Sequence, residues 1–416
     1  MSFSRLERKI AAQLSKFPKC KQGLKRSYQW VNWLFFRHRK PWVTNHSLEL
    51  AVPGSRLETF FGYYDEAIEN RGGSHFLVHE YDASTKRRPV PGGNVTIHVI
   101  EKQTGEPVCS FSSKAFNFQQ GAKARWLDDS TFCFNDYCSE TDRYVSRIFK
   151  VNGEECAKTE MPVYDAFGKD FYVSLSFERL SVLRPDYGYF AHKRDIDIFD
   201  VENDGIWKCS FEGGEELICN LHRLINFSSR DSMRDAVHKV NHLSINPVGE
   251  KLIFLHRWFT QGGERGDRLM TLNMDGSGLK LLVDQGMVSH CAWLNDTEVV
   301  CYCRNNSHGD AHYRVNTVTG DLTLLSNKLL GFGDGHQSIK NNKMIFDSYP
   351  NRARMKRLFL YCFDTDQVSE IASFYEPMAY NLETRCDLHP RWSDDGKAVY
   401  IDSVHAGRRQ LWRLIL

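Results

Sequence analysis

The chain has 416 residues and a formal net charge of +2, with 41% hydrophobic and 25% charged residues, which is ordinary for a globular protein. No apolar run reaches the roughly 18–20 residues that a membrane-spanning helix requires, and the cysteines lack the paired CxxC spacing typical of structural zinc sites. A helical membrane protein and a CxxC metal framework are therefore excluded.

Positive charge is concentrated at the N-terminus. Residues 1–42 contain eleven Lys and Arg residues against Glu7 alone, so this segment carries +10 and the rest of the chain −8. Apolar residues recur at helical spacing within residues 4–17, and Pro18 interrupts that pattern. A second apolar run, rich in aromatic residues, follows at 24–36. We expect residues 1–46 to form a basic, amphipathic, partly helical extension outside the main domain.

This extension has two alternative roles. Tryptophans beside basic residues suit the headgroup zone of an anionic membrane, to which each basic side chain adds about 1 kcal/mol. Alternatively, the aromatic run packs on the side of the main domain and the charges are solvated. No early apolar segment of a secretory signal is present, so we expect a cytoplasmic protein. Contact with the inner face of the cytoplasmic membrane through residues 1–42 is the first alternative.

A unit of alternating apolar residues leading into a turn recurs seven times in the rest of the chain. The copies are Val95–Glu101, Tyr144–Val151, Ile196–Val201, Leu269–Met274, His312–Val318, Leu358–Phe363 and Leu411–Leu416. Six of them end in turn signals at Gly105, Gly153, Gly205, Gly276, Gly320 and Asp366, where Gly or Asp tolerates the positive φ of a tight hairpin. The long step between Gly205 and Gly276 indicates an insertion.

A second pattern precedes each copy: an apolar residue followed by a turn-rich tetrad, as at Trp126, Ile245, Trp293 and Trp392, with Leu183–Gly188 as the blade-three example. Four antiparallel strands repeated radially form a propeller blade. The seventh copy ends the chain, so we predict that Ser47–Val52 supplies the missing outer strand and closes the ring. The prediction is an all-β, seven-bladed β-propeller over residues 47–416. The even spacing disfavours the alternative, a run of separate small β-domains.

Histidines recur at one position of this repeat. Three residues before the apolar residue stand His242, His290, His336 and His389 in the last four blades, and Lys123 and Leu180 in blades two and three. Innermost strands line the channel of a propeller, so we expect the four imidazoles to converge at its mouth. Imidazole binds first-row metals, and Asp387 shares a strand face with His389. We predict a divalent metal on His290, His336, Asp387 and His389; the alternative is that each histidine bonds a carbonyl of its own blade.

The loops between the second and third strands of the blades should open on the same face, and they are rich in arginine and histidine. The candidates for binding a ligand on that face are Arg352, Arg354, His405 and Arg408 in these loops, with Arg234 and His238 from the insertion before blade four. Guanidinium groups recognise carboxylate or phosphate, so we predict an anionic ligand; a solvated rim of surface arginines is the alternative. Nucleic acid is not expected as a partner.

Two motifs carry a resemblance to a known family. They are Phe254-Leu-His256-Arg-Trp258 with Asp267-Arg268-Leu269, and Asp387-Leu-His389-Pro-Arg-Trp392 with Asp402-Ser403 and Gly407. With them, residues 236–416 resemble the oligogalacturonate lyases, a family of seven-bladed propellers with a histidine-rich, manganese-type metal centre. The family's Gln, His and His leading into the last blade correspond here to Thr384, Asp387 and His389, so two of these three ligands differ.

The resemblance implies β-elimination on a uronate-containing anionic oligo- or polysaccharide. A divalent metal, manganese-type first and zinc second, would be the cofactor. His242 or His256 would be the base, and Arg257 or Arg268 would neutralise the carboxylate. The alternative is a non-catalytic propeller that binds a glycan or a partner in a capsule or O-antigen polysaccharide biosynthesis system.

Overall fold

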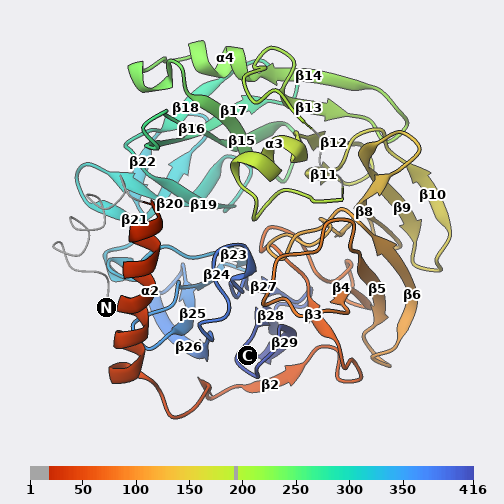
Figure 1. Ribbon diagram of the computed structural model, residues 1–416, viewed down its shortest axis with the longest axis vertical. Coiled ribbons are helices and arrows are strands. Elements are labelled where there is room, and N and C mark those ends of the chain that lie inside the picture. Colours follow the sequence, from red (N-terminus) through yellow and green to blue (C-terminus); the bar gives the residue numbers. More distant parts are fainter. Residues whose placement is uncertain (1–17, 192–194) are drawn as a thin grey trace.

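The computed structural model describes residues 18–191 and 195–416, whose strands form seven antiparallel sheets arranged in a ring (Figure 1). Six sheets have four strands and one has five. The chain is therefore a seven-bladed β-propeller, as the sequence predicts.

The first three blades run outward in chain order. Blade one is β3 (Glu58–Phe60), β4 (His75–Tyr81), β5 (Val95–Glu101) and β6 (Pro107–Ser113). Blade two is β7 (Arg125–Trp126), β8 (Thr131–Cys138), β9 (Arg143–Lys150) and β10 (Glu155–Lys158). Blade three is β11 (Asp165–Phe167), β12 (Phe171–Ser174), β13 (Gly205–Cys209) and β14 (Glu215–Asn220).

The last four blades complete the ring. Blade four is β15 (Val237–Ile245), β16 (Lys251–Phe259), β17 (Arg265–Asn273) and β18 (Lys280–Val283). Blade five is β19 (Val288–Trp293), β20 (Glu298–Asn305), β21 (Gly309–Asn316) and β22 (Leu322–Leu324). Blade six is β23 (Gln337–Lys340), β24 (Lys343–Asp347), β25 (Met355–Cys362), β26 (Gln367–Tyr375) and the added β1 (Trp42–Thr44). Blade seven is β27 (Arg391–Trp392), β28 (Ala398–Ser403), β29 (Gln410–Ile415) and β2 (Ser47–Leu50).

The ring closes through β2, which pairs antiparallel with β29 and places Leu48 opposite Leu414. Leu48 packs against the buried core of blade seven, and Ala51 donates a backbone hydrogen bond to Leu411. The predicted closure by Ser47–Val52 is confirmed.

Blade three differs from the prediction. Ile196–Val201 is not a strand, and Leu183–Gly188 follows helix α3 (Phe177–Leu183) instead of an inner strand. The cause is a set of tertiary hydrogen bonds made by this helix. Ser176 caps the helix by accepting a hydrogen bond from the Arg179 amide, and the Arg179 guanidinium donates to the carbonyls of Ile198 and Asp200. Those carbonyls are thereby withdrawn from a strand ladder.

The remaining helical elements are short. The predicted insertion before blade four contains α4 (Leu221–Asn226) and the 3-10 turn η2 (Asp231–Met233). Two further 3-10 turns are η3 (Asn327–Leu329) and η4 (Leu382–Thr384).

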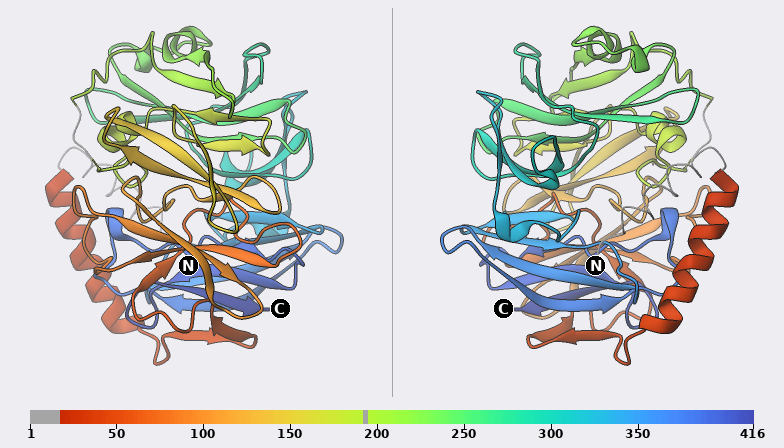
Figure 2. Two further views of the ribbon diagram at one scale, coloured as in Figure 1. Left: turned by 90° about the vertical axis from the view of Figure 1, so that its right-hand side faces the viewer. Right: turned by 90° about the vertical axis from the view of Figure 1, so that its left-hand side faces the viewer.

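Helix α2 (Pro18–Phe36) lies at the rim of the propeller beside blade six, on the face turned to the viewer in Figure 1 (Figures 1 and 2). Trp33 stacks on Tyr375 with ring centroids 6.4 Å apart, and the Arg352 guanidinium lies 5.9 Å from the Phe36 ring. Other apolar residues of the helix stay exposed, with Phe35 at 81%. No helix in the described part of the chain has the length and hydropathy to cross a membrane. The helix predicted over 4–17 lies outside the described residues.

Candidate metal centre

The structure brings the four predicted ring histidines together in the channel. Ring centroids are 4.1 Å apart for His290 and His336, 4.2 Å for His336 and His389, and 6.1 Å for His242 and His290. Tyr63 lies among them, stacked on His242 at 5.4 Å and 4.9 Å from His389. These histidines form one cluster, which we call the histidine ring.

The backbone aims these side chains by an unusual local conformation. His242 and His389 have positive φ of 54° and 44°, and Lys123, at the same repeat position in blade two, has 51°. In blade four the pairing register shifts between Asn241 and Ser244, and such a bulge redirects a side chain. In blade three the position three residues before the end of β11 is Tyr164, which replaces the predicted Leu180, a residue of α3.

Two carboxylates orient the histidines in the middle of the ring. His336 donates from Nδ1 to Asp347 at 3.0 Å, and the same carboxylate accepts the backbone N–H of His389 at 3.1 Å. His290 donates from Nδ1 to Asp334 at 3.0 Å. A carboxylate on Nδ1 fixes the tautomer in which Nε2 carries a free lone pair, as in metal-binding histidines.

The residues fit a divalent metal. Ligand atoms of His336, Asp387 and His389 lie within 4.8 Å of one another, and all three residues are buried. In the described part of the chain, Nε2 of His336 and of His389 has no hydrogen-bond partner. Ligands about 2.1 Å from one ion stand about 3.4 Å apart at a tetrahedral angle, so a shift of about 1 Å brings the three onto one ion. Mixed imidazole and carboxylate ligands suit manganese or zinc.

Metal binding needs neutral imidazole and ionised carboxylate, and the pKa shifts of His389, His290 and Asp387 favour these forms. Burial holds the pKa of His389 well below its ordinary value and lowers that of His290. Burial would raise the pKa of Asp387, but Lys356 and Arg385, at 2.9 and 2.7 Å, hold it well below its ordinary value. For His336, burial opposes the charged form, yet Asp347 outweighs it and raises the pKa.

His242 stands at the edge of the ring as a neutral base. Its Nδ1 lies 3.1 Å from the Tyr63 hydroxyl, and its backbone N–H donates to the Tyr164 hydroxyl at 3.0 Å. Burial, followed by the charge of Arg257, holds its pKa well below the ordinary value. A cavity of about 20 Å³ beside it, which Tyr63 and Tyr64 help to line, has room for about one water molecule.

Arg257 lies on the same side of the channel as His242. It is buried, forms an ion pair with Asp267 at 2.7 Å and donates to the Val288 carbonyl at 3.0 Å. Its positive charge lowers the pKa of His242, which lies on the neighbouring strand of the same blade.

His256, Arg268 and His238 form a separate, buried chain of hydrogen bonds. Arg268 donates to His256 at 3.0 Å, His256 donates to His238 at 3.0 Å, and His238 donates to the Met233 carbonyl at 3.0 Å. Arg268 also donates to the Phe227 carbonyl. This chain ties blade four to its insertion, and the structure does not bring it into the histidine ring.

Two of the predicted ligand-binding arginines are used inside the propeller. Arg354 forms a buried ion pair with Glu376 at 2.5 Å. Arg408 donates to the backbone carbonyls of Ser55 and Arg56, which holds the chain segment that leads into blade one.

The other predicted ligand-binding residues also lie away from the ring. His405 is buried between Trp42 and Trp412, with ring centroids 5.2 and 4.6 Å away. Arg352 lies against Phe36 of α2. Arg234 has a side chain that is 78% exposed, and its nearest ion-pair partner is Asp231 at 3.8 Å.

Residues that the sequence pattern missed surround the channel mouth. Arg184 and Arg385 lie 5.1 and 5.9 Å from the ring of Tyr187, which itself lies 5.4 Å from that of His242. Tyr349, 44% exposed, stands 6.0 Å from His336. All four lie outside the strands. Arg184 and Tyr187 belong to the segment Leu183–Gly188, which the sequence pattern assigns to a turn and not to the site, and no periodic signal marks Tyr349 or Arg385.

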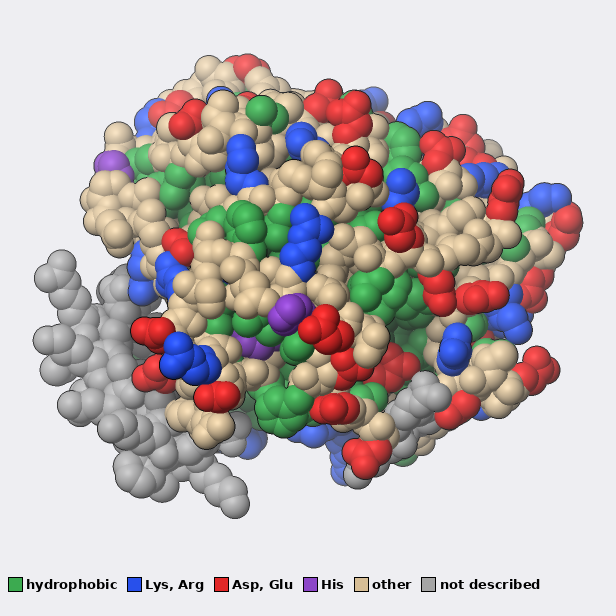
Figure 3. All heavy atoms as spheres, turned by 90° about the horizontal axis from the view of Figure 1, so that it is seen from above, with side chains coloured by type: hydrophobic (Ala, Val, Ile, Leu, Met, Phe, Trp, Pro, Cys, Tyr) green, Lys and Arg blue, Asp and Glu red, His purple; other side chains and the backbone are tan. Residues whose placement is uncertain are grey.

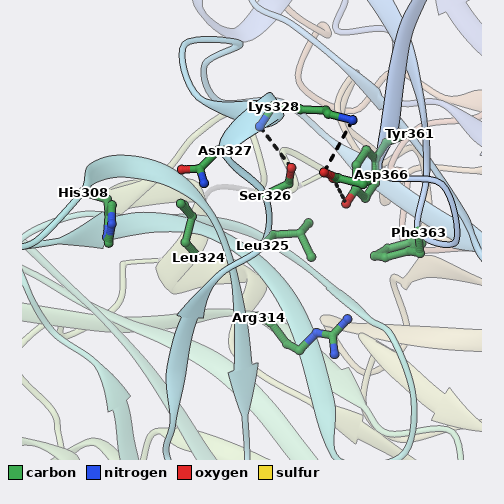
Figure 4. A pocket seen from close by; sticks show the side chains of 10 residues that line it. All are labelled: His308, Arg314, Leu324, Leu325, Ser326, Asn327, Lys328, Tyr361, Phe363 and Asp366. Atoms are coloured by element: carbon green, nitrogen blue, oxygen red, sulfur yellow. Dashed lines mark hydrogen bonds and ion pairs between the residues drawn. The ribbon is translucent and has the colours of Figure 1, made fainter.

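A hollow of about 650 Å³ lies elsewhere, at the outer edge of blades five and six (Figure 4). His308, Arg314 and the Lys328–Asp366 ion pair line it. On the face drawn in Figure 3, acidic and basic side chains are interspersed. We assign chemistry to the histidine ring, because its buried donor atoms lack partners, whereas the hollow has no such group among its described lining residues.

The fold and the ring define a seven-bladed propeller with a histidine-lined channel. No protein-family model and no curated protein sequence matches this chain. Among solved structures, an oligogalacturonate lyase in complex with manganese is similar, with a TM-score of 0.62 and 12% identity over 92% of this chain and 95% of that one. An oligogalacturonate lyase from Vibrio parahaemolyticus has a TM-score of 0.56 and 12% identity, over 91% and 98%. The fold of this chain is thus that of the oligogalacturonate lyase propellers, and fold alone does not define activity.

Proposed function

We propose that the chain is a metal-dependent, lyase-like enzyme that cleaves a uronate-containing anionic glycan by β-elimination. The observation that carries this proposal is the buried set His336, Asp387 and His389. Two of its imidazole nitrogens have no partner among the described residues, and His242, whose pKa is well below its ordinary value, belongs to the same histidine ring. The likeness in fold to a lyase in complex with manganese supports it.

In this mechanism, the proton on the carbon next to the uronate carboxylate is removed first. His290, His336, Asp387 and His389 would hold a divalent ion, manganese-type or zinc, which would supply Lewis-acid neutralisation of that carboxylate. Arg257 adds a fixed positive charge. When His242 donates Nδ1–H to the Tyr63 oxygen, its Nε2 takes the proton. The C–H electrons form the new C=C bond, the glycosidic C–O bond breaks, and the leaving oxygen takes a proton from water.

The test combines metal analysis with a screen of acidic glycans for ultraviolet absorbance of an unsaturated uronate. We expect stoichiometric manganese or zinc, and His242→Ala should lower the rate by about 10²–10⁴-fold, the usual contribution of a general base. His308→Ala, an exposed histidine in the hollow of Figure 4, is the control. Metal-free protein without absorbance change on any acidic glycan would refute the proposal.

A second candidate is a non-catalytic propeller that binds a glycan or partner in a capsule or O-antigen biosynthesis system. Thr384, where the resembled family has Gln, favours it: its hydroxyl donates to the Asn381 carbonyl at 2.9 Å and is used within a turn. Saccharide binding without any unsaturated product would support this candidate.

We also propose that residues 1–42 hold the protein at the anionic, inner face of the cytoplasmic membrane. Trp30, Leu34 and Phe35 of α2 are exposed beside a basic N-terminal segment, although Trp33 packs on blade six. Flotation with anionic liposomes should recover the full chain but not a chain lacking residues 1–40. Equal recovery of both in the soluble fraction at low salt would leave only the packing role.

A further inference from the structure

Blade four contains buried polar groups that the mechanism does not use. Lys239 on β15 is 0% exposed, and in the described part of the chain its Nζ has no hydrogen-bond partner. Asn241 is two residues along, on the same strand face. It is 1% exposed, and neither its amide nitrogen nor its amide oxygen has a partner among the described residues. Unpaired buried groups destabilise a protein, so their presence together needs an explanation.

The carboxylates near Lys239 are already engaged. Asp267 pairs with Arg257 at 2.7 Å and with Arg265 at 2.8 Å. Asp186 likewise pairs with Arg184 at 2.9 Å and with Arg385 at 2.6 Å. Each nearby carboxylate thus serves two arginines, and the amine is left without a counterion. Burial first, then Arg257 and Arg184, hold the pKa of Lys239 well below its ordinary value.

Lys239 and Asn241 lie on the same strand as His242, and neither is among the proposed metal ligands. Lys239 is opposite Arg257 in the pairing of β15 with β16, and both charges act on His242. Lys239 is influenced most by Arg257, Arg184, Asp186 and Asp267. Asp387 is influenced instead by Lys356, Arg385, His336 and His389. Arg385 stands between these two sets of charges, because it pairs with both Asp186 and Asp387.

We propose that Lys239 and Asn241, together with Arg257, form a carboxylate-binding subsite outside the metal centre. An incoming carboxylate accepts hydrogen bonds from the Lys239 amine and the Asn241 amide and supplies the missing counterion. The subsite deepens the proposed function and rests on it for the identity of the carboxylate, which is that of an acidic sugar. A neutral sugar leaves the amine unpaired, so the subsite selects for charged substrates.

The experiment uses two nearly isosteric variants, Lys239→Met and Asn241→Leu, in the full chain. Acetate is the minimal anion, and digalacturonate and neutral galactobiose are the saccharides. Without any anion, both variants should unfold at or above the wild-type temperature, because an apolar side chain replaces an unpaired polar one. Acetate at constant ionic strength should raise the wild-type Tm and leave that of both variants unchanged.

By calorimetry, Lys239→Met should weaken digalacturonate binding about 10- to 100-fold, the loss of a charge-assisted hydrogen bond, and galactobiose should bind none of the proteins. The control is Lys251→Met, whose amine on β16 already donates to Asn273 at 2.8 Å; its response to acetate should match the wild type. If Lys239→Met does not fold, Asn241→Leu carries the same test.

The outcomes separate this subsite from the lyase proposal. A wild-type acetate response in both variants, or digalacturonate binding of wild-type strength in Lys239→Met, overturns the subsite and leaves the lyase proposal standing. The other informative outcome is loss of the acetate response in both variants, combined with no binding or cleavage of digalacturonate by the wild type. It supports the subsite and counts against the lyase proposal.

Discussion

Asp347 is the carboxylate on which the orientation of two proposed metal ligands depends. It accepts the Nδ1–H and the backbone N–H of His336, at 3.0 and 2.8 Å, and the backbone N–H of His389 at 3.1 Å. Asp347→Asn keeps the shape of the side chain but removes the negative charge that makes Nε2 of His336 a stronger electron-pair donor to a metal ion. Losing such a carboxylate typically costs 10- to 100-fold in metal affinity, so we expect Mn²⁺ binding to weaken by about 1.4–2.7 kcal/mol.

Calorimetric titration of chelator-stripped protein with Mn²⁺, and in parallel with Zn²⁺, measures this effect. Thermal unfolding without metal checks that the variant is folded. Asp334→Asn is the matched comparison, because that carboxylate orients His290 alone; a similar loss there identifies His290 as a fourth ligand. Wild-type affinity in Asp347→Asn, or a wild type that binds neither metal, would refute the reasoning.

Three further outcomes are expected. Arg257→Ala should weaken binding of an acidic saccharide by about 1.5–3 kcal/mol; unchanged affinity by calorimetry would remove Arg257 from the site. Leu48→Ala, in the closing strand β2, should lower the free energy of unfolding by about 1–2 kcal/mol, since the side chain is only half-buried; a denaturant midpoint equal to wild type would contradict that role. Burial lowers the pKa of His405 from 6.5 to about 4. The stability that depends on its neutral form is therefore complete above pH 6.5 and is lost as the pH falls towards 4, where the protein is less stable by about 3 kcal/mol. Between pH 6.5 and 4, the free energy of unfolding should fall less in His405→Phe than in the exposed-histidine control His308→Gln. Equal falls would count against this role of His405.

Much of the fold follows from local sequence, because alternation and turn chemistry act between neighbouring residues. Val95–Glu101 is β5 as predicted, and the strand Ser47–Leu50 is found from the absence of a last hairpin. The prediction for blade three is wrong for a non-local reason. Ile196–Val201 alternates like a strand, but the Arg179 guanidinium binds its carbonyls, and no pattern within the segment shows that arginine.

The candidate site, like the fold, is predicted only in part from the sequence. The histidine ring follows from repeat register, since equivalent positions of equivalent blades meet at one axis. Arg184 and Arg385 could not be predicted from the repeat register, because they lie in irregular loops. His256 and Arg268 belong to a motif that resembles a catalytic blade, yet they occupy β16 and β17, farther from the axis than the innermost strand, and bond to the insertion. A motif identifies a blade but not the neighbours of each side chain.

The ring positions of the first three blades show why the chemistry lies on the other four. In blade one, Glu69 pairs with Phe76 as Trp126 pairs with Phe132 in blade two, so the ring position is Glu66. Glu66 pairs with Lys123 of blade two at 2.7 Å. The Lys123 amine in turn lies 4.6 Å from the ring of Tyr164 of blade three, whose hydroxyl accepts the backbone N–H of His242. These three side chains satisfy one another, so they offer little to a ligand. From blade four onward the position is histidine, and at His336 and His389 Nε2 remains unpartnered among the described residues. The three ligands of the proposed metal site that lie closest together, His336, Asp387 and His389, therefore come from blades six and seven, within the stretch in which the motifs occur.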